Sequence, residues 1–242
     1  MSENYKGLST QDYIAQLSID CVIFGYQNEA LKVLVPKLNF QGDFWGLPSG
    51  FIYQHEDVDQ AAKRILEDRT QIKDIYLEQF YVFGNANRNN AEFMSSLLAQ
   101  NPQLQGSQEE YDWFVRRFVS IGYYALVDIN KVKPQTTYID EKMEWVDINQ
   151  LPNLILDGKD IIAKALQALR ANFDDHLVGY NLLPDTFTMK DLQNLYETIF
   201  DKPFRRNNFQ KLMLDLNILD RLEKQFTGAA NKAPYLYKFK EI

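Results

Sequence analysis

Cationic side chains gather without acids in two stretches near the end of this sequence, where they could bind the phosphates of a nucleic acid. Residues 202–214 contain four basic residues and no acidic one, and residues 224–240 repeat that pattern. Residues 175–242 hold ten basic and nine acidic residues, whereas residues 1–174 hold sixteen and twenty-four. A single basic stretch is most often a solvated surface. The elements that carry the two stretches therefore decide whether they form a binding site.

Residues 188–240 have the pattern of a winged helix-turn-helix. Thr188 and Asp191 have the spacing of a capping box, with Asp in place of the usual Glu, and an apolar helical face follows. Pro203 ends this helix and can begin another, because proline is tolerated at the first helical position. Asp201 is then a suitable N-cap for the second helix.

The second helix and a hairpin wing would carry the basic residues. The helix is expected to bury Phe209, Leu212, Met213 and Leu216. At about 100° per residue, Asn207 and Lys211 lie on the opposite face. Residues 218–226 and 235–240 are predicted strands on either side of a loop of small residues. Cations here suit phosphates and amides suit base edges. The predicted DNA-binding residues are Lys202, Arg205, Arg206, Asn207, Asn208, Gln210, Lys211 and Lys232.

A second group of functional residue types lies between residues 45 and 72. The sequence there resembles the Nudix box, G-x5-E-x7-R-E-U-x-E-E-x-G-U, where U is a bulky aliphatic residue. The matching positions are Gly50, Glu56, Arg64, Leu66 and Ile72, after the lead-in Trp-x-Leu-Pro-x-Gly. The resemblance implies a loop–helix–loop in a Nudix-like mixed-sheet α/β/α sandwich.

The positions that carry Nudix chemistry do not match. Nudix glutamates place Mg²⁺ against a diphosphate, which needs several carboxylate oxygens on one helical face. Here Ile65, Asp68 and Arg69 occupy the three glutamate positions, and Gln71 replaces the glycine that ends the helix. Arg69 puts a positive charge where the cation should sit. We therefore expect no metal, no cofactor and no catalytic residue, although Glu56 and Arg64 can still pair.

A Nudix-like domain followed by a winged helix-turn-helix resembles the Nudix-related transcription regulators over nearly the whole chain. The resemblance implies a homodimer that binds a palindromic double-stranded operator and responds to a small molecule. In that family the effector is ADP-ribose in one branch and a sugar such as L-arabinose in another. Because the degraded box weakens the nucleotide option, the sequence favours a repressor of sugar utilisation with a pentose effector.

The expected effector site opens near the box loop. Trp45 and Tyr53 could stack on a ligand, although packing is the commoner role of such rings. Polar residues at strand ends near the same opening could bind hydroxyl groups. The predicted effector-binding residues are Asp20, Lys37, Asp43, Trp45, Tyr53 and Glu144.

The elements before residue 174 indicate a mixed-sheet domain. Alternating residues predict a hairpin over 17–36 with a polar turn at 26–29. Helical spacing predicts helices over 57–70 and 157–171, the second capped by Asp157. Further strands are predicted at 76–83, 114–128 and 143–146, with a long loop and a short helix, 91–99, between the first two. We expect an α+β protein with domains at residues 1–174 and 175–242.

Composition narrows the classes of protein. The single cysteine, Cys21, excludes an intramolecular disulfide and points to a reducing compartment. Apolar stretches are too short to span a bilayer, so a cytoplasmic protein without membrane contact is expected. His55 and His176 have no neighbouring ligand at metal-binding spacing. The alternatives are a divergent Nudix hydrolase acting on a nucleoside diphosphate derivative such as ADP-ribose, and a structural interaction protein. The box substitutions count against the first and the basic stretches against the second.

Overall fold

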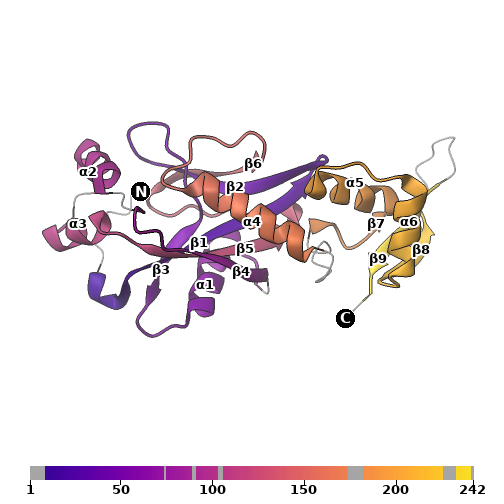
Figure 1. Ribbon diagram of the computed structural model, residues 1–242, viewed down its shortest axis with the longest axis horizontal. Coiled ribbons are helices and arrows are strands. Elements are labelled where there is room, and N and C mark those ends of the chain that lie inside the picture. The colour runs from indigo at the N-terminus through magenta and orange to yellow at the C-terminus, as the bar shows by residue number, and fades with distance from the viewer. Residues whose placement is uncertain are drawn as a thin grey trace.

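The computed structural model describes residues 9–73, 75–88, 91–102, 106–173, 182–225 and 233–240. Within these ranges it divides into a sheet-based part and a smaller helix-and-hairpin part (Figure 1). The predicted domain boundary at residue 174, together with Lys232 and His176, lies outside the described residues.

Six strands of the described chain form one mixed sheet, in the order β4-β5-β1-β2-β6 with β3 paired to β1. β1 pairs with β5 in parallel and with β2 and β3 antiparallel. The strands are β1 (Tyr13–Gln27), β2 (Ala30–Leu38), β3 (Ser49–Tyr53), β4 (Tyr76–Phe83), β5 (Val119–Val127) and β6 (Asp140–Asp147). Short 3-10 turns η1 (Thr10–Asp12) and η3 (Ile129–Lys131) flank them.

Helices cover both faces of this sheet, because successive side chains of β1 alternate between two apolar clusters. Ile19, Cys21 and Ile23 pack with α1 (Val58–Thr70), whereas Val22 and Phe24 pack with α4 (Gly158–Asn172). The two helices therefore enclose the sheet from opposite sides (Figure 1). Helices α2 (Ala91–Gln100) and α3 (Gln108–Val115) lie together at the end away from the smaller part.

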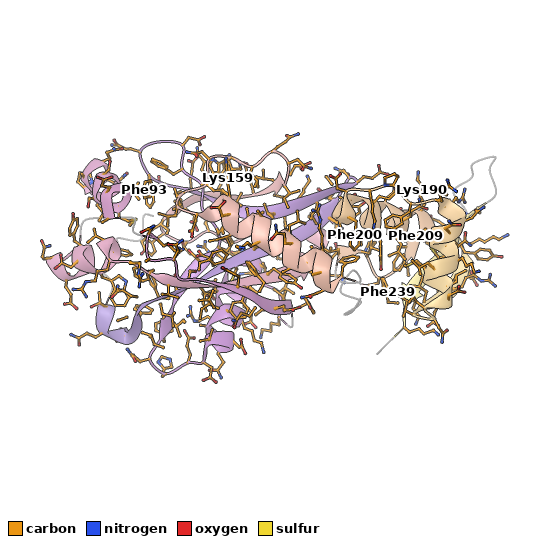
Figure 2. All side chains as sticks on the ribbon, in the orientation of Figure 1. Phe93, Lys159, Lys190, Phe200, Phe209 and Phe239 are labelled. Carbon is orange, nitrogen blue, oxygen red and sulfur yellow. The ribbon has the colours of Figure 1, made fainter. Side chains whose placement is uncertain are left out.

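The smaller part contains α5 (Met189–Phe200), α6 (Arg206–Asp215) and a sheet of β7 (Phe187–Thr188), β9 (Tyr235–Phe239) and β8 (Leu219–Lys224). The capping box of Thr188 and Asp191 at the start of α5 is confirmed. Phe209 packs between α5 and α6 (Figure 2). Phe239 of β9 packs against Phe187 of β7 on the sheet side of the same core. These elements form the predicted helix, turn, helix and hairpin.

Some local predictions were wrong. Residues 114 and 115 end a helix rather than begin a strand, because Ser107 and Glu110 form a capping box that starts α3. That S-x-x-E signal is visible in the sequence. Strand β3 was not predicted, because its five residues lie in the stretch that the resemblance assigns to the loop of the box. The hairpin turn is confined to Asn28 and Glu29, which both adopt positive φ.

No helix in the described part of the chain combines the length and apolarity that crossing a membrane requires.

Candidate DNA-binding and effector sites

Helix α6 presents a polar face that points away from the core. Phe209 and Met213 are buried four residues apart, and Asn207 and Lys211 on the opposite side are exposed, as predicted. The prediction that Leu212 and Leu216 are buried was wrong: their exposed fractions are 51% and 48%. Only Phe209 and Met213 of α6 are buried in the core. Leu212 lies about 60° from Phe209 and about 100° from Met213 around the helix. Leu216 follows the last residue of α6, Asp215.

The turn before α6 is fixed by α5. The predictions that Asp201 caps α6 and that Pro203 begins it were wrong, because α6 begins only at Arg206. Asp201 instead ends α5 in the left-handed conformation, with φ +52°. The N–H of Phe204 donates to Glu197 Oε1 at 2.8 Å, and Gln193 donates to the same oxygen at 2.9 Å. These hydrogen bonds lower the pKa of Glu197. Lys202 Nζ lies 5.2 Å from the ring centres of both Phe200 and Phe204.

The other predicted DNA-binding residues reach solvent from the same segment. α6 starts at Arg206 with Arg205 as its N-cap residue, and Arg205, Arg206 and Asn208 are exposed. Gln210 is half-buried. Cations and amides on this face carry no competing acid between residues 202 and 214.

The wing adds residues that are not among the predicted DNA-binding residues. Tyr235 is 39% exposed, and two cations lie over its ring: Arg221 Cζ at 4.7 Å and Lys224 Nζ at 5.2 Å from the centroid. Lys238, by contrast, lies 3.9 Å from Asp220. The alternation of β8 and β9 could have indicated that Arg221 and Tyr235 share a face, but their register comes from the structure.

The box loop keeps its framework. Arg64 Nη2 lies 2.5 Å from Glu56 Oε1 and 2.9 Å from the carbonyl oxygen of Phe51, so the predicted ion pair is confirmed. Its hydrogen bond from Arg64 lowers the pKa of Glu56. Ile65, at the first glutamate position, packs against Gly50: a Cβ there would lie 2.8 Å from Ile65 Cδ1. An apolar contact thus occupies that position.

Arg69 does not have the role expected from the sequence, a free positive charge at the metal position of the box. Its side chain does not place an uncompensated charge in the box, because it is 6% exposed and paired with Asp140 at the start of β6. Gln71 ends α1 with φ +58°, the backbone conformation that favours the glycine of the box pattern. Among the described residues, no cluster of three or more His, Cys, Asp or Glu could hold a metal ion.

Three of the other predicted effector residues lie near Trp45: Lys37, Asp43 and Glu144. Trp45 is buried; its Nε1 donates to Asp43 at 3.1 Å, and Lys142 Nζ lies 5.5 Å from its ring. Lys142 also pairs with Glu144 at 2.5 Å. The backbone of Lys37 forms an isolated antiparallel β-bridge with that of Trp45, but its amine pairs with Glu141 at 2.8 Å.

Tyr53 lies in a different cluster. Its ring stacks on Tyr13, with centroids 4.8 Å apart, and on His55 at 5.4 Å, and Arg64 lies over it at 4.6 Å. It belongs to the framework of the box loop and does not join the group around Trp45.

Asp20 lies in a partly buried polar cluster on the α4 side of the sheet. Ser120 Oγ donates to its carboxylate at 2.5 Å, and Arg88 Nη2 lies 3.4 Å away. Arg88 also binds both carboxylate oxygens of Asp157, at 2.7 and 3.0 Å. Burial raises the pKa of Asp20, while Ser120 and Arg88 oppose that rise.

Sequence reasoning missed the roles of Arg88 and Asp157. Asp157 was expected to cap α4, and it does stand at the N-cap position, but its carboxylate holds Arg88 and makes no cap hydrogen bond. The available signal was Arg88 itself, the single basic residue among residues 85–115. Arg88 Nη1 also donates to the carbonyl oxygen of Phe118 at 3.0 Å.

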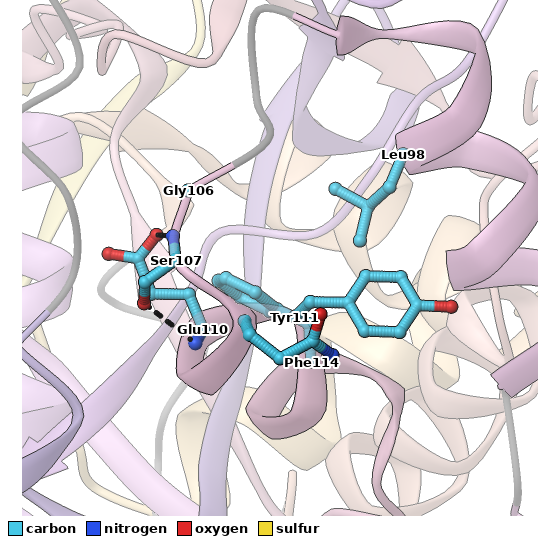
Figure 3. A pocket seen from close by; sticks show the side chains of 7 residues that line it. Leu98, Gly106, Ser107, Glu110, Tyr111 and Phe114 are labelled. Atoms are coloured by element: carbon cyan, nitrogen blue, oxygen red, sulfur yellow. Dashed lines mark hydrogen bonds between the residues drawn. The ribbon is translucent and has the colours of Figure 1, made fainter.

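Aromatic rings border this cluster. Phe118 packs on Phe51 of the box loop at 5.5 Å and on Trp113 at 5.7 Å. Beyond them, a cavity of about 230 Å³ lies beside α2 and α3 (Figure 3). Two polar side chains on its wall already have partners within the capping box. The N–H of Ser107 donates to Glu110 Oε2, and the N–H of Glu110 donates to Ser107 Oγ. The lining residues are Leu98, Gly106, Ser107, Gln108, Glu110, Tyr111 and Phe114.

Sequence comparison connects both parts of the chain to proteins of known type. Residues 179–239 match the family model of the NrtR DNA-binding winged helix domain. The chain is 27% identical over 235 residues to the "ADPR responsive transcriptional repressor NtrR" of Acinetobacter baylyi. That alignment covers 94% of this chain and 84% of the relative.

Solved structures show the same fold. NrtR of Shewanella oneidensis superimposes with a TM-score of 0.69 at 24% identity, covering 93% of this chain and 94% of its own; it has also been solved with a 27mer DNA. A MutT/nudix family protein of Enterococcus faecalis gives a TM-score of 0.65 at 16% identity, covering 94% and 87%. These matches confirm the prediction of a Nudix-like domain followed by a winged helix domain.

Proposed function

Since this chain is an NrtR-like, Nudix-related protein with a C-terminal winged helix domain, we propose that it is an effector-responsive repressor that binds double-stranded operator DNA. The observation that carries the proposal is the exposed, acid-free face of α6 and the turn before it, which offers Arg206, Asn207 and Lys211 to a ligand. Recognition helices of this fold enter the major groove and contact base edges with their first residues. A homodimer would present two such helices to a palindromic site.

We propose ADP-ribose as the effector. The A. baylyi relative is named for its response to it, whereas no similar protein named above responds to a pentose. The expectation of L-arabinose therefore receives no support. Arg88 could bind the diphosphate of the ligand, because its guanidinium is largely shielded from solvent. It lies beside β3 of the box loop, where Ser49 pairs with Asp20. Phe118 and Phe51 offer aromatic surface nearby.

The experiment that tests this function measures DNA capture with and without the effector. The full chain is expected to select sites from a random pool of duplex DNA, and ADP-ribose, but not L-arabinose, is expected to release them. ADP-ribose at 100 times its Kd should stabilise the protein by about 2.7 kcal/mol, which raises Tm by roughly 5–10 °C for a chain of this size.

An Arg88→Lys variant should lose most of that rise in Tm, because lysine keeps the charge but not the two-pronged hydrogen bonding. Arg117→Lys, at an exposed position between α3 and β5, is the matched control. Selection of no site by the wild-type chain, or release by L-arabinose alone, would contradict the proposal.

We further propose that the Nudix-like domain senses its ligand without hydrolysing it. The packing of Ile65 on Gly50 and the pairing of Arg69 with Asp140 leave Glu67 and Asp68 as the remaining carboxylates in the second half of the box. We expect no hydrolysis of ADP-ribose with Mg²⁺, measured by release of AMP. Turnover that disappears in Glu67→Gln or Asp68→Asn would establish the divergent hydrolase instead.

A further inference from the structure

The β1–β2 hairpin reaches out of the sheet and touches the first helix of the winged helix domain (Figure 1). At its tip, the side chain of Glu29 accepts a hydrogen bond from Asn194 Nδ2 at 2.7 Å. The carbonyl oxygen of Glu29 accepts another from Thr198 Oγ1 at 3.2 Å. Asn194 and Thr198 are one helical turn apart on α5, so one residue binds one face of that helix.

Glu29 holds this contact at a conformational cost. Asn28 and Glu29 have φ of +54° and +57°, the pattern of a two-residue hairpin turn that favours glycine at its second position. A glutamate there strains the backbone, because its Cβ is crowded in the left-handed conformation. A strained residue whose side chain and carbonyl both bind the next domain indicates a role at that contact rather than in the turn.

A second element makes the same crossing. In the last turn of α4, Arg170 Nε donates to the carbonyl oxygen of Ile199 at 2.6 Å. Phe173, which follows α4, packs edge-on against Tyr196 and Phe200 at 5.0 and 5.8 Å. Phe200 accordingly lies where α4 meets α5 (Figure 2). The hairpin and α4 thus both end on α5.

The other ends of these two elements are joined by Arg88. Its guanidinium bridges Asp20 of β1 and Asp157 at the start of α4. From Asp20 to Glu29 the strand spans about 30 Å, and the 15 residues of α4 span about 22 Å. Arg88 is therefore the point where both elements can be disturbed together at a distance from DNA.

Movement of α5 would be transmitted to α6. Glu197 of α5 holds the backbone of Phe204, and Phe209 of α6 packs on Tyr196 and Phe204 at 5.2 and 5.5 Å. These contacts hold the turn to α5 on one side and to α6 on the other. The two helices would therefore move together.

From this geometry we infer that Arg88 couples the effector site to DNA binding through two arms, the β1–β2 hairpin and α4, and that Glu29 is the positioning residue at the hairpin end. The inference rests on the proposed function. An anionic ligand that binds Arg88 competes with Asp20 and Asp157 for its guanidinium. Loss of either bond changes how β1 and α4 lie relative to each other, and both changes arrive at α5. Such a ligand shifts the DNA-binding equilibrium by its different affinity for the two arrangements.

The test measures the Kd for a selected operator with and without saturating ADP-ribose in the full chain. Couplings of this kind typically range over about 5–150-fold. Glu29→Gly removes the side-chain contact in a turn that glycine suits, so the hairpin should persist. We expect this variant to keep the effector-free Kd and the ADP-ribose-induced rise in Tm, while the ratio of the two Kd values falls toward 1.

Two further variants separate coupling from structure. Asn28→Gly changes the neighbouring left-handed position of the same turn and should keep the wild-type ratio. Glu29→Gln retains the acceptor oxygen for Asn194 and should restore most of it. An unchanged ratio in Glu29→Gly would overturn the inference, as would an equal loss of DNA affinity with and without ADP-ribose. If wild-type DNA binding does not respond to ADP-ribose at all, the proposed effector is wrong and the inference falls with it.

Discussion

Replacing Asp140 by alanine is expected to lower the free energy of unfolding by about 3–5 kcal/mol, because it leaves the buried guanidinium of Arg69 without its partner. Asp140 also accepts hydrogen bonds from the backbone N–H and the hydroxyl of Thr137, at 2.6 and 2.8 Å. The carboxylate therefore joins the end of α1 to the start of β6. Denaturant titration followed by circular dichroism measures the loss.

The matched control is the adjacent residue. Glu141 pairs with Lys37 at the surface, where its side chain is 49% exposed, so Glu141→Ala should cost at most about 1 kcal/mol. Replacing both buried partners, as Arg69→Met with Asp140→Leu, should recover much of the loss because no unpaired charge remains. Equal small losses in Asp140→Ala and Glu141→Ala would show that the pair contributes little.

DNA affinity is expected to fall by a factor of roughly 10⁴–10⁵ between 50 and 200 mM salt. Four or five phosphate contacts per subunit, doubled in a dimer, give a log–log slope of about −7 to −9. Arg206→Ala should make that slope shallower by about 2 and weaken binding to all sequences alike. Asn207→Ala should instead cost about 1–3 kcal/mol on the selected site and little on random DNA. Gel shifts at three salt concentrations measure both effects.

Lys159→Ala provides the control for a simple change of net charge. Lys159 is an exposed cation at the start of α4, in the sheet-based part and far from α6 (Figure 2). Its removal should leave the slope unchanged. Wild-type affinity in both Arg206→Ala and Asn207→Ala would mean that the basic stretches are only solvated surface.

Local patterns predicted most of the elements because their causes are local. The capping box of Thr188 and Asp191 needs only residues three apart, and it starts α5 as expected. Helical spacing likewise gave α1 within a residue. The exposure of Leu212 could not be predicted this way. Helix periodicity defines the apolar side of a helix, but it does not say how much of that side the rest of the domain covers.

Spacing along the chain also determined the pairing of Glu56 with Arg64, because eight residues of one loop and helix fix their separation. It could not determine what Arg69 does, because its partner, Asp140, lies 71 residues away. From the sequence, we expected Arg69 to place a positive charge where the metal ion of a Nudix box would sit. Only the fold brings the start of β6 to the end of α1, where Asp140 becomes the buried partner of Arg69.

The sequence by itself determined the two kinds of domain, the box framework and the cationic face of α6, since each depends on residue types at short, regular intervals. Only the tertiary structure decided that Asp157 would bind Arg88 in place of capping α4, and that Asp20 would join them. The reason is physical: a guanidinium that the fold shields from solvent must be paired, and the partners of Arg88 lie 68 and 69 residues away, a separation that no periodicity connects.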